Sequence, residues 1–195
     1  ERLKKGESVS AREFSDEEKV FLDEYNLLSL KPMLYIANID ENEIDSHSDQ
    51  GVTRMLQERF GKDRVIEICA EIEAEISELE NGERTEYLQG MGLAESGLKK
   101  MILASYQLLD LIIFYTIANN KLRAWRLKLG SNAPQAAGLI HSDMEKGFIK
   151  AEVMRYDDLV KFKDVANIRE KGLLKIEGKD YIIQDGDVVK FLFNV

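Results

Sequence analysis

The sequence predicts a protein of mixed α/β and α+β class, in which a parallel-sheet unit is followed by a small mixed sheet. Three observations lead to this prediction. A strand, a helix and a second strand follow one another between residues 31 and 70, and from Ile117 the pattern changes to short strand-like runs separated by glycine turns. Charge changes as well: residues 1–111 hold 13 Lys and Arg against 25 Asp and Glu, a net of −12, whereas residues 112–195 hold 14 against 11, a net of +3. We therefore place a domain boundary near residue 112.

Composition indicates a folded protein. The chain has 195 residues, 44% of them hydrophobic, and only two prolines, which suits one large or two small domains with real cores. The apolar run at 108–115 is interrupted by Asp110 and is far shorter than the roughly 20 residues of a membrane span. The first residues lack the apolar core of a signal peptide, and the single cysteine, Cys69, excludes an internal disulfide and a cysteine-based metal cluster. We expect a cytoplasmic protein without a membrane partner.

The first predicted elements are a helical lead-in and a strand. Residues 1–28 are helical in pattern, with a capped start at Ser15 to Glu18 and apolar contacts from Val20, Phe21, Leu22, Leu27 and Leu28. Residues 31–38 begin with a proline and continue with an apolar run, which is typical of a buried parallel strand.

A crossover unit follows. Residues 52–60 predict a helix with Met55, Leu56 and Phe60 facing inward, and residues 64–70 predict a second buried strand. Strand, helix and strand at this spacing form a parallel pair. We therefore expect Met33 to Ala37 and Val65 to Cys69 to be neighbours, with Asn38 and Ala70 at the same carboxyl edge, where open α/β sheets bind ligands.

The remaining elements are helices and then strands. Residues 71–115 have helical periodicity, with breaks at 81–82 and 90–92 and with Leu98, Met101, Ile102, Leu108 and Leu109 facing inward. Strand-like runs follow, and a small mixed sheet packed on one helix near residues 134–143 would accommodate them. These runs are 121–128, 148–153, 173–176, 181–183 and 188–193.

Several of these segments carry a family resemblance that covers essentially the whole chain. Residues 27–41 resemble the strand and the adenine-reading Asn-x-x-Glu motif of YchF-type (Obg-like) P-loop ATPases. Four further segments, 123–125, 133–141, 148–152 and 184–195, resemble the TGS domain of that family.

The resemblance implies a fold and an activity. Residues 1–28 would be the returning arm of a helical coiled-coil insertion, 29–111 the C-terminal part of a P-loop GTPase-type nucleotide-binding domain, and 112–195 a ubiquitin-like β-grasp TGS domain. It further implies an ATPase that uses ATP, or GTP, with Mg²⁺, and that meets the ribosome or RNA through its TGS domain. Because family members are roughly twice this long, we expect the chain to be their C-terminal portion.

The chain contains no phosphate-binding loop. The motif Gly-x-x-x-x-Gly-Lys-[Ser/Thr] cradles phosphates with backbone amides and one lysine. The nearest match, Gly92 to Lys99, has one residue too many before its lysine and follows no strand, so we interpret it as a helix start. Although the full-length parent is expected to be an enzyme, we expect no catalytic residue and no useful hydrolysis from this chain alone.

The candidate cofactor-binding residues are Asn38, Ile39, Glu41, Cys69 and Ala70. GTPases read guanine with Asn-Lys-x-Asp; here Ile39 replaces the lysine and Glu41 the aspartate, which favours adenine. Asn-x-x-Glu after a strand is also compatible with a helix cap. By the resemblance, Cys69 and Ala70 form the second wall of the base pocket, although a lone cysteine is also compatible with a buried hydrophobe.

Basic residues of the second domain are candidates for RNA contact, above all Lys146, Lys150 and Arg155. Lys121 and Arg123 share one strand face while Arg126 and Lys128 share the other, so they cannot all form one patch, and a solvated mixed surface is the alternative.

We interpret His141 as structural and Trp125 as a core or domain-contact residue. Two functions remain open: part of a ribosome-associated ATPase, or a non-enzymatic TGS module that binds RNA or protein.

Overall fold

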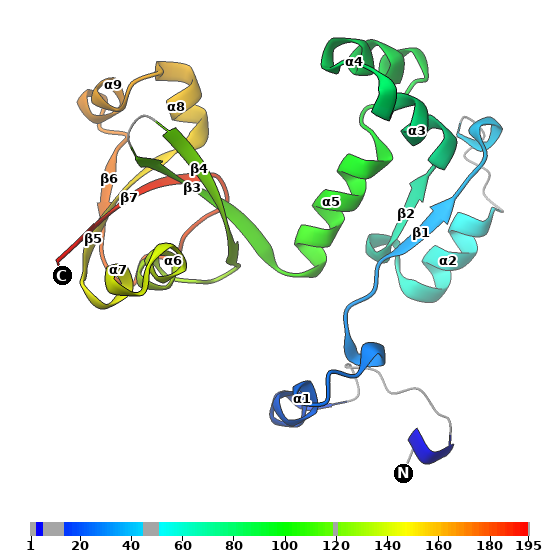
Figure 1. Ribbon diagram of the computed structural model, residues 1–195, viewed down its shortest axis with the longest axis horizontal. Helices are drawn as coiled ribbons and strands as arrows, with labels where there is room; N and C mark the ends of the chain where they lie inside the picture. Colours follow the sequence, from blue (N-terminus) through cyan, green and yellow to red (C-terminus); the bar gives the residue numbers. More distant parts are fainter. Residues whose placement is uncertain (1–2, 6–13, 45–50, 119–120, 195) are drawn as a thin grey trace. The chain divides into compact units, whose positions relative to one another are not determined.

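The chain folds into two compact units, Glu1–Leu108 and Leu109–Val195. The computed structural model, shown in Figure 1, describes residues 3–5, 14–44, 51–118 and 121–194. The division between the units lies close to the boundary expected near residue 112.

The first unit combines a two-stranded parallel sheet with helices. Short 3-10 helices, labelled η, alternate with α-helices and strands. In chain order the elements are η1 Leu3–Lys5, α1 Asp16–Asp23, η3 Leu28–Leu30, β1 Tyr35–Asn38, η4 Glu41–Glu43, α2 Val52–Phe60, η5 Lys62–Arg64, β2 Val65–Ile68, α3 Ala70–Glu78, α4 Asn81–Gly90 and α5 Gly97–Leu108.

The N-terminal helix begins where the sequence predicts. The Ser15 side chain accepts a hydrogen bond from the Glu18 amide, and the Glu18 carboxylate accepts one from the Ser15 amide, which completes a capping box. Of the predicted apolar contacts, Leu22 and Leu27 are half-buried, whereas Val20 is 71%, Phe21 60% and Leu28 80% exposed.

The parallel pair is confirmed. β1 and β2 are adjacent and parallel, with Tyr35 opposite Val65 and Asn38 opposite Ile68. The burial expected of β1 is only half right, since Ala37 is 3% exposed and Ile36 is 48% exposed. Side chains alternate between the two faces of a strand, so one face of β1 is covered and the other is open.

Helix α2 has the predicted bounds but a different inward face. Thr53, Leu56, Gln57 and Phe60 are buried or half-buried, and their spacing is that of one helix stripe. The Phe60 ring stacks on Tyr35 of β1, with centroids 3.9 Å apart. Met55 lies outside this stripe and is 65% exposed, so its predicted inward position is wrong.

The helical stretch after β2 is shorter than predicted. The first break falls between α3 and α4, so residues 81–82 begin a helix instead of ending one, while the second break at 90–92 is confirmed. α5 ends at Leu108, and a strand begins at Leu111. Leu98, Ile102 and Leu109 are about half exposed, contrary to their predicted inward positions.

The second unit is a five-stranded mixed sheet with the order β4-β3-β7-β5-β6. β3 pairs antiparallel with β4 and parallel with β7, while β5 pairs antiparallel with β7 and β6. Its elements are β3 Leu111–Ala118, β4 Lys121–Lys128, α6 Ala133–Ile140, α7 Ser142–Lys146, β5 Phe148–Arg155, α8 Tyr156–Phe162, α9 Val165–Glu170, β6 Lys175–Glu177 and β7 Asp187–Phe193.

Two cores cover the two faces of this sheet. α6 and α7 lie on one face and α8 and α9 on the other (Figure 1). The first core includes Phe114, Ala137 and Val189, and the second includes Met154 and Ile168. The predicted mixed sheet is confirmed, but it packs on four helices and not on one, and residues 181–183 contribute an isolated bridge between Ile182 and Asn132 instead of a strand.

None of the helices in the described ranges is both long enough and apolar enough to cross a bilayer.

Candidate functional site

A side-chain hydrogen bond joins the carboxyl ends of the two parallel strands. Asn38 is the last residue of β1, and its Oδ1 accepts a hydrogen bond of 3.0 Å from the backbone amide of Ala70, the first residue of α3. The Ile39 amide donates to the Ile68 carbonyl at 3.0 Å and extends the pairing by one residue. This confirms that Asn38 and Ala70 share one sheet edge and that Asn38 braces the neighbouring loop.

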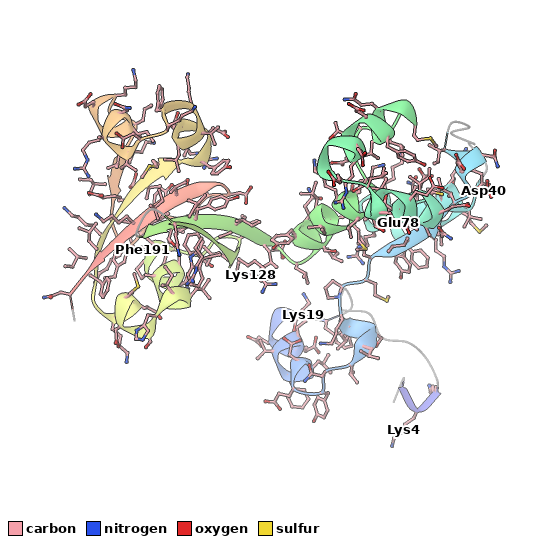
Figure 2. All side chains as sticks on the ribbon, turned by 45° about the horizontal axis from the view of Figure 1, so that its top comes forward. Lys4, Lys19, Asp40, Glu78, Lys128 and Phe191 are labelled. Atoms are coloured by element: carbon pink, nitrogen blue, oxygen red, sulfur yellow. The ribbon has the colours of Figure 1, made fainter. Side chains whose placement is uncertain are left out.

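The helix cap after β1 is a different residue. Asp40 Oδ1 accepts hydrogen bonds from the Asn42 amide at 3.0 Å and from Asn42 Nδ2 at 2.7 Å, and Glu43 Oε2 accepts from the Asp40 amide at 3.2 Å. The Asn42 amide, followed by its side chain, lowers the pKa of Asp40. Asp40 therefore caps η4, whereas Asn38 reaches across to the next strand. Figure 2 labels Asp40 beside this edge.

Glu41 and Ile39 flank the edge in different environments. Glu41 is exposed at the first position of η4. Ile39 is half-buried against a cluster formed by Cys69, Ile72 and Ile76. The Ile39 side chain is thus shared between the edge and this cluster.

Cys69 is a free thiol, 8% exposed, within that cluster. Its burial agrees with the interpretation of a small hydrophobe. Ala70 is exposed, and its amide is already bonded to Asn38. The wall that this loop offers to a ligand is therefore mainly backbone.

A carboxylate of the same chain caps the start of α5. Glu73 Oε1 accepts a hydrogen bond of 2.5 Å from the Gly97 amide, and Oε2 accepts one of 3.1 Å from the Leu98 amide. A Cβ on Gly97 would lie 2.9 Å from Ile68 Cγ1, so only glycine fits this close approach. The interpretation of Gly92 to Lys99 as a helix start is confirmed. Because the free amides at a helix start favour an anion, the Glu73 carboxylate is a suitable acceptor for them.

A cavity of about 690 Å³ opens on the α2 side of β1. Asn38 and Ile39 line it together with residues of α2 such as Thr53 and Gln57, but Glu41, Cys69 and Ala70 do not. The five predicted residues therefore share an edge without lining one cavity. In the described ranges, no cluster of three His, Cys, Asp or Glu side chains is arranged to hold a metal ion.

Tyr87 is a neighbour of this region that sequence reasoning missed. Its hydroxyl donates a hydrogen bond to the Glu75 carboxylate, which is the main reason why its pKa is raised to about 12; the charge of Glu41 raises it further. Glu73, which closes α5, was missed as well. Their partners are 12 and 24 residues away, a separation for which no sequence motif exists.

The three basic candidates of the second unit do not form one surface. Lys146 is exposed at the end of α7. Lys150 and Arg155 both lie on β5, an odd number of residues apart, and so project to opposite faces of the sheet.

Arg155 has a structural partner. Its Nη1 lies 2.8 Å from Oδ1 of Asp187, which is fully buried. Asp187 Oδ2 also accepts hydrogen bonds from the Tyr181 hydroxyl at 2.8 Å and from the Gln184 amide at 2.9 Å. Arg155 thus neutralises a buried carboxylate, a structural role beside the RNA contact predicted for it with Lys146 and Lys150.

The interpretations of His141 and Trp125 agree with the structure. His141 Nδ1 accepts a hydrogen bond of 3.2 Å from the Asp143 amide and caps α7. Trp125 is half-buried against the core under α6, and its Nε1 donates to Thr116 Oγ1 at 2.9 Å.

Residues 111–194 match the family model YchF-GTPase_C, described as "Protein of unknown function (DUF933)". The chain is 47% identical over 171 residues to the ribosome-binding ATPase YchF of Haemophilus ducreyi, covering 88% of this chain and 47% of the relative. It is 41% identical over 194 residues to the protein of that name from Escherichia coli O157:H7, covering 100% of this chain and 53% of the relative. It thus spans about half the length of these curated relatives.

Two solved structures have a fold similar to that of this chain. The YchF GTPase of Schizosaccharomyces pombe superposes with a TM-score of 0.78 at 28% identity, covering 92% of this chain and 48% of that chain. A GTP-binding protein from Pyrococcus horikoshii superposes with a TM-score of 0.58 at 20% identity, covering 93% and 52% of the two chains, and shows a likeness of fold alone.

Proposed function

Since this chain belongs to the YchF family, we propose that it supplies the base-reading edge of an ATP- or GTP-binding site and a ribosome-contacting C-terminal domain. The observation that carries the first part is the hydrogen bond from the Ala70 amide to Asn38 Oδ1. It joins the two strand-end loops at the edge where parallel α/β sheets bind their ligands.

The edge has groups suited to a purine base. Asn38 Oδ1 accepts a hydrogen bond from the Ala70 amide. Asn38 Nδ2 has no hydrogen-bond partner among the described residues, so this side-chain amide NH2 group is free to donate to a base nitrogen. Ile39 and Glu41 stand where guanine-reading proteins have lysine and aspartate, and this difference favours adenine. The loop at Cys69 and Ala70 would supply the opposite wall, mainly with its backbone, because the Cys69 side chain is buried.

Phosphate and magnesium ligands are a separate requirement, and no Gly-x-x-x-x-Gly-Lys-[Ser/Thr] motif occurs in the 195 residues. ATP with Mg²⁺ would therefore touch this chain through its base, and its phosphates and metal would be held by groups outside these residues. Contacts to a base hold substrate and transition state alike, so they do not lower the barrier to hydrolysis. The chain alone is expected to bind nucleotide without turning it over.

We further propose that the second unit is a β-grasp TGS domain that contacts the ribosome. If the strands β3 to β7 are numbered 1 to 5 in chain order, their order in the sheet is 2-1-5-3-4. The first and last strands of the chain order, β3 and β7, are parallel neighbours at the centre, and α6 lies in the connection from β4 to β5. This arrangement, together with the resemblance of its sequence, supports the assignment. The relatives are named ribosome-binding, and a domain of net +3 is better suited to a polyanion than the acidic remainder of the chain. Such a protein would work in the cytoplasm.

Substitutions at Asn38 test the base site. Asn38→Ala removes both the hydrogen bond to the Ala70 amide and the free NH2 group, while Asn38→Asp keeps an acceptor for the Ala70 amide and removes the NH2 donor. Each is expected to weaken ATP binding by the chain about 2- to 10-fold, the worth of one hydrogen bond. Asn42→Ala, at the neighbouring cap, is the control and should leave binding unchanged. Equilibrium binding of ATP that is equally strong in all three variants would overturn the assignment.

A further inference from the structure

One strand accounts for the net positive charge of the second unit. Residues 111–142 contain no Asp or Glu, although the chain holds 36 of them, and they contain four Lys and Arg. All four lie on β4: Lys121, Arg123, Arg126 and Lys128. The rest of residues 112–195 holds 10 Lys and Arg against 11 Asp and Glu. Without β4, residues 112–195 would have a net charge of −1.

β4 lies at the edge of the sheet. It is the first strand in the order β4-β3-β7-β5-β6 and pairs with β3 alone. Six of its eight residues are exposed, and its end is marked by Lys128 in Figure 2. In a central strand, alternation would separate the two pairs of cations by the thickness of the sheet. At an edge, the long side chains of both faces border the same open rim.

The cations on this rim are largely uncompensated. Lys128 Nζ lies 3.7 Å from Asp110 Oδ2 and donates to the Leu109 carbonyl at 2.8 Å. Lys121, Arg123 and Arg126 form no ion pair with any described residue. By contrast, Arg155 and Arg169 on other elements are paired with Asp187 and Glu152.

An aromatic ring lies within the same rim. The Arg123 guanidinium lies 5.5 Å from the centroid of the Trp125 ring, which is half-buried. An arginine next to a partly open indole is a combination that binds single-stranded nucleic acid, because bases stack on the rings while cations hold the phosphates. Leu122, 45% exposed, adds apolar surface on the other face of β4.

We propose that the β4 rim, defined by Lys121, Arg123, Trp125 and Arg126, is the surface that contacts RNA, with the phosphate backbone following the open edge of the sheet. This rests on the proposed ribosome contact of the second unit and specifies where it lies. It transfers the contact from Lys146, Lys150 and Arg155 to a strand on the opposite side of the sheet order from β5 and β6.

Charged edge strands also have another use. Lysine and arginine at a sheet edge prevent two sheets from pairing edge to edge. If that were the only role of these cations, removing them would promote self-association and leave RNA binding intact. The two roles therefore predict opposite results from the same variant.

The test compares two variants of equal charge change. The rim variant is Lys121→Gln with Arg123→Gln and Arg126→Gln. The control variant is Lys163→Gln with Lys175→Gln and Lys179→Gln, three exposed lysines of the same unit. Each chain is titrated with a single-stranded oligouridine of about 12 nucleotides, a length within the usual range for such sites, and is sedimented with purified 70S ribosomes. Trp125 is the sole tryptophan, so its fluorescence reports contact at β4.

We expect oligouridine to quench Trp125 in the wild-type and control chains. In the rim variant, binding should fall at least about tenfold, and the slope of log affinity against log salt should flatten by about 2, since each phosphate contributes about 0.7 on single strands. RNA binding or sedimentation that is equal in the rim and control variants would overturn this inference while leaving the ribosome contact in place. A wild-type chain that neither binds oligouridine nor sediments with ribosomes at low salt would overturn both.

Discussion

Removing the buried carboxylate of Asp187 should unfold the second unit far more readily than any surface change. Asp187 is fully buried and accepts hydrogen bonds from Arg155, Tyr181 and the Gln184 amide. Asp187→Ala leaves these three donors without their acceptor. Breaking a buried charged network costs about 3–5 kcal/mol, so we expect a loss of unfolding free energy in that range.

The other members of the network should cost less. The Arg155 side chain is 51% exposed, and solvent screens its pair with Asp187, so Arg155→Gln should cost only about 1–2 kcal/mol. Arg169→Gln breaks an ion pair of 3.1 Å with Glu152 in which the arginine is 61% exposed. As the matched control, it should cost about 1 kcal/mol or less.

The assay is urea unfolding followed by fluorescence. Trp125 lies in the second unit and is the sole tryptophan, so the signal reports this unit even if the two units unfold separately. A loss below about 1 kcal/mol for Asp187→Ala, or a loss equal to that of Arg169→Gln, would refute the reasoning that Asp187 organises the fold.

Three further predictions follow. Gly147→Ala should destabilise the second unit by about 1–3 kcal/mol, because a Cβ there would lie 1.9 Å from the Asn194 carbonyl oxygen. Gly178→Ala, where nothing lies within 4 Å of the added Cβ, is the control and should change stability by no more than about 0.5 kcal/mol. Equal effects of the two substitutions in urea unfolding would contradict the prediction. Burial, followed by the hydrogen bond to Asp187, raises the pKa of Tyr181 above its usual value of 10.0. The stability that the Tyr181 hydroxyl contributes should be complete below pH 10 and be lost at higher pH, so the difference in unfolding free energy between wild type and Tyr181→Phe should shrink there. A difference that stays constant with pH would show that the pKa is unshifted. The chain alone should hydrolyse ATP no faster than a heat-inactivated sample, and steady turnover by a preparation free of contaminating ATPases would sink that expectation.

Local pattern was enough to find the parallel pair. The apolar runs around β1 and β2 and the helix between them are each specified by nearby residues, and the crossover rule then places Asn38 and Ala70 at one edge. The run at 108–115 was assigned to a helix because a short apolar segment has no decisive period. Pairing with β4 and β7 makes residues 111–118 a strand.

Contacts between distant residues were beyond sequence reasoning. Nothing near Glu73 indicates that it closes a helix 24 residues later. Nothing near Arg155 indicates a buried partner 32 residues away, so its structural role cannot be inferred from the sequence. β4 was divided into two faces correctly, but only the strand order shows that it is an edge, where the two faces meet.

The central claim is that the edge between β1 and β2 holds a nucleotide base. Its most direct test is a titration of the isotopically labelled chain with ATP, followed by the amide signals in nuclear magnetic resonance spectra. Because only base contacts are available, we expect weak binding, on the order of 1 mM. Shifts should be concentrated at the Asn38 side-chain amide and at the backbone amides of Ile39, Glu41 and Ala70, with none in residues 109–195. Saturating ATP that leaves these signals unmoved, or that moves signals only elsewhere in the chain, would contradict the account.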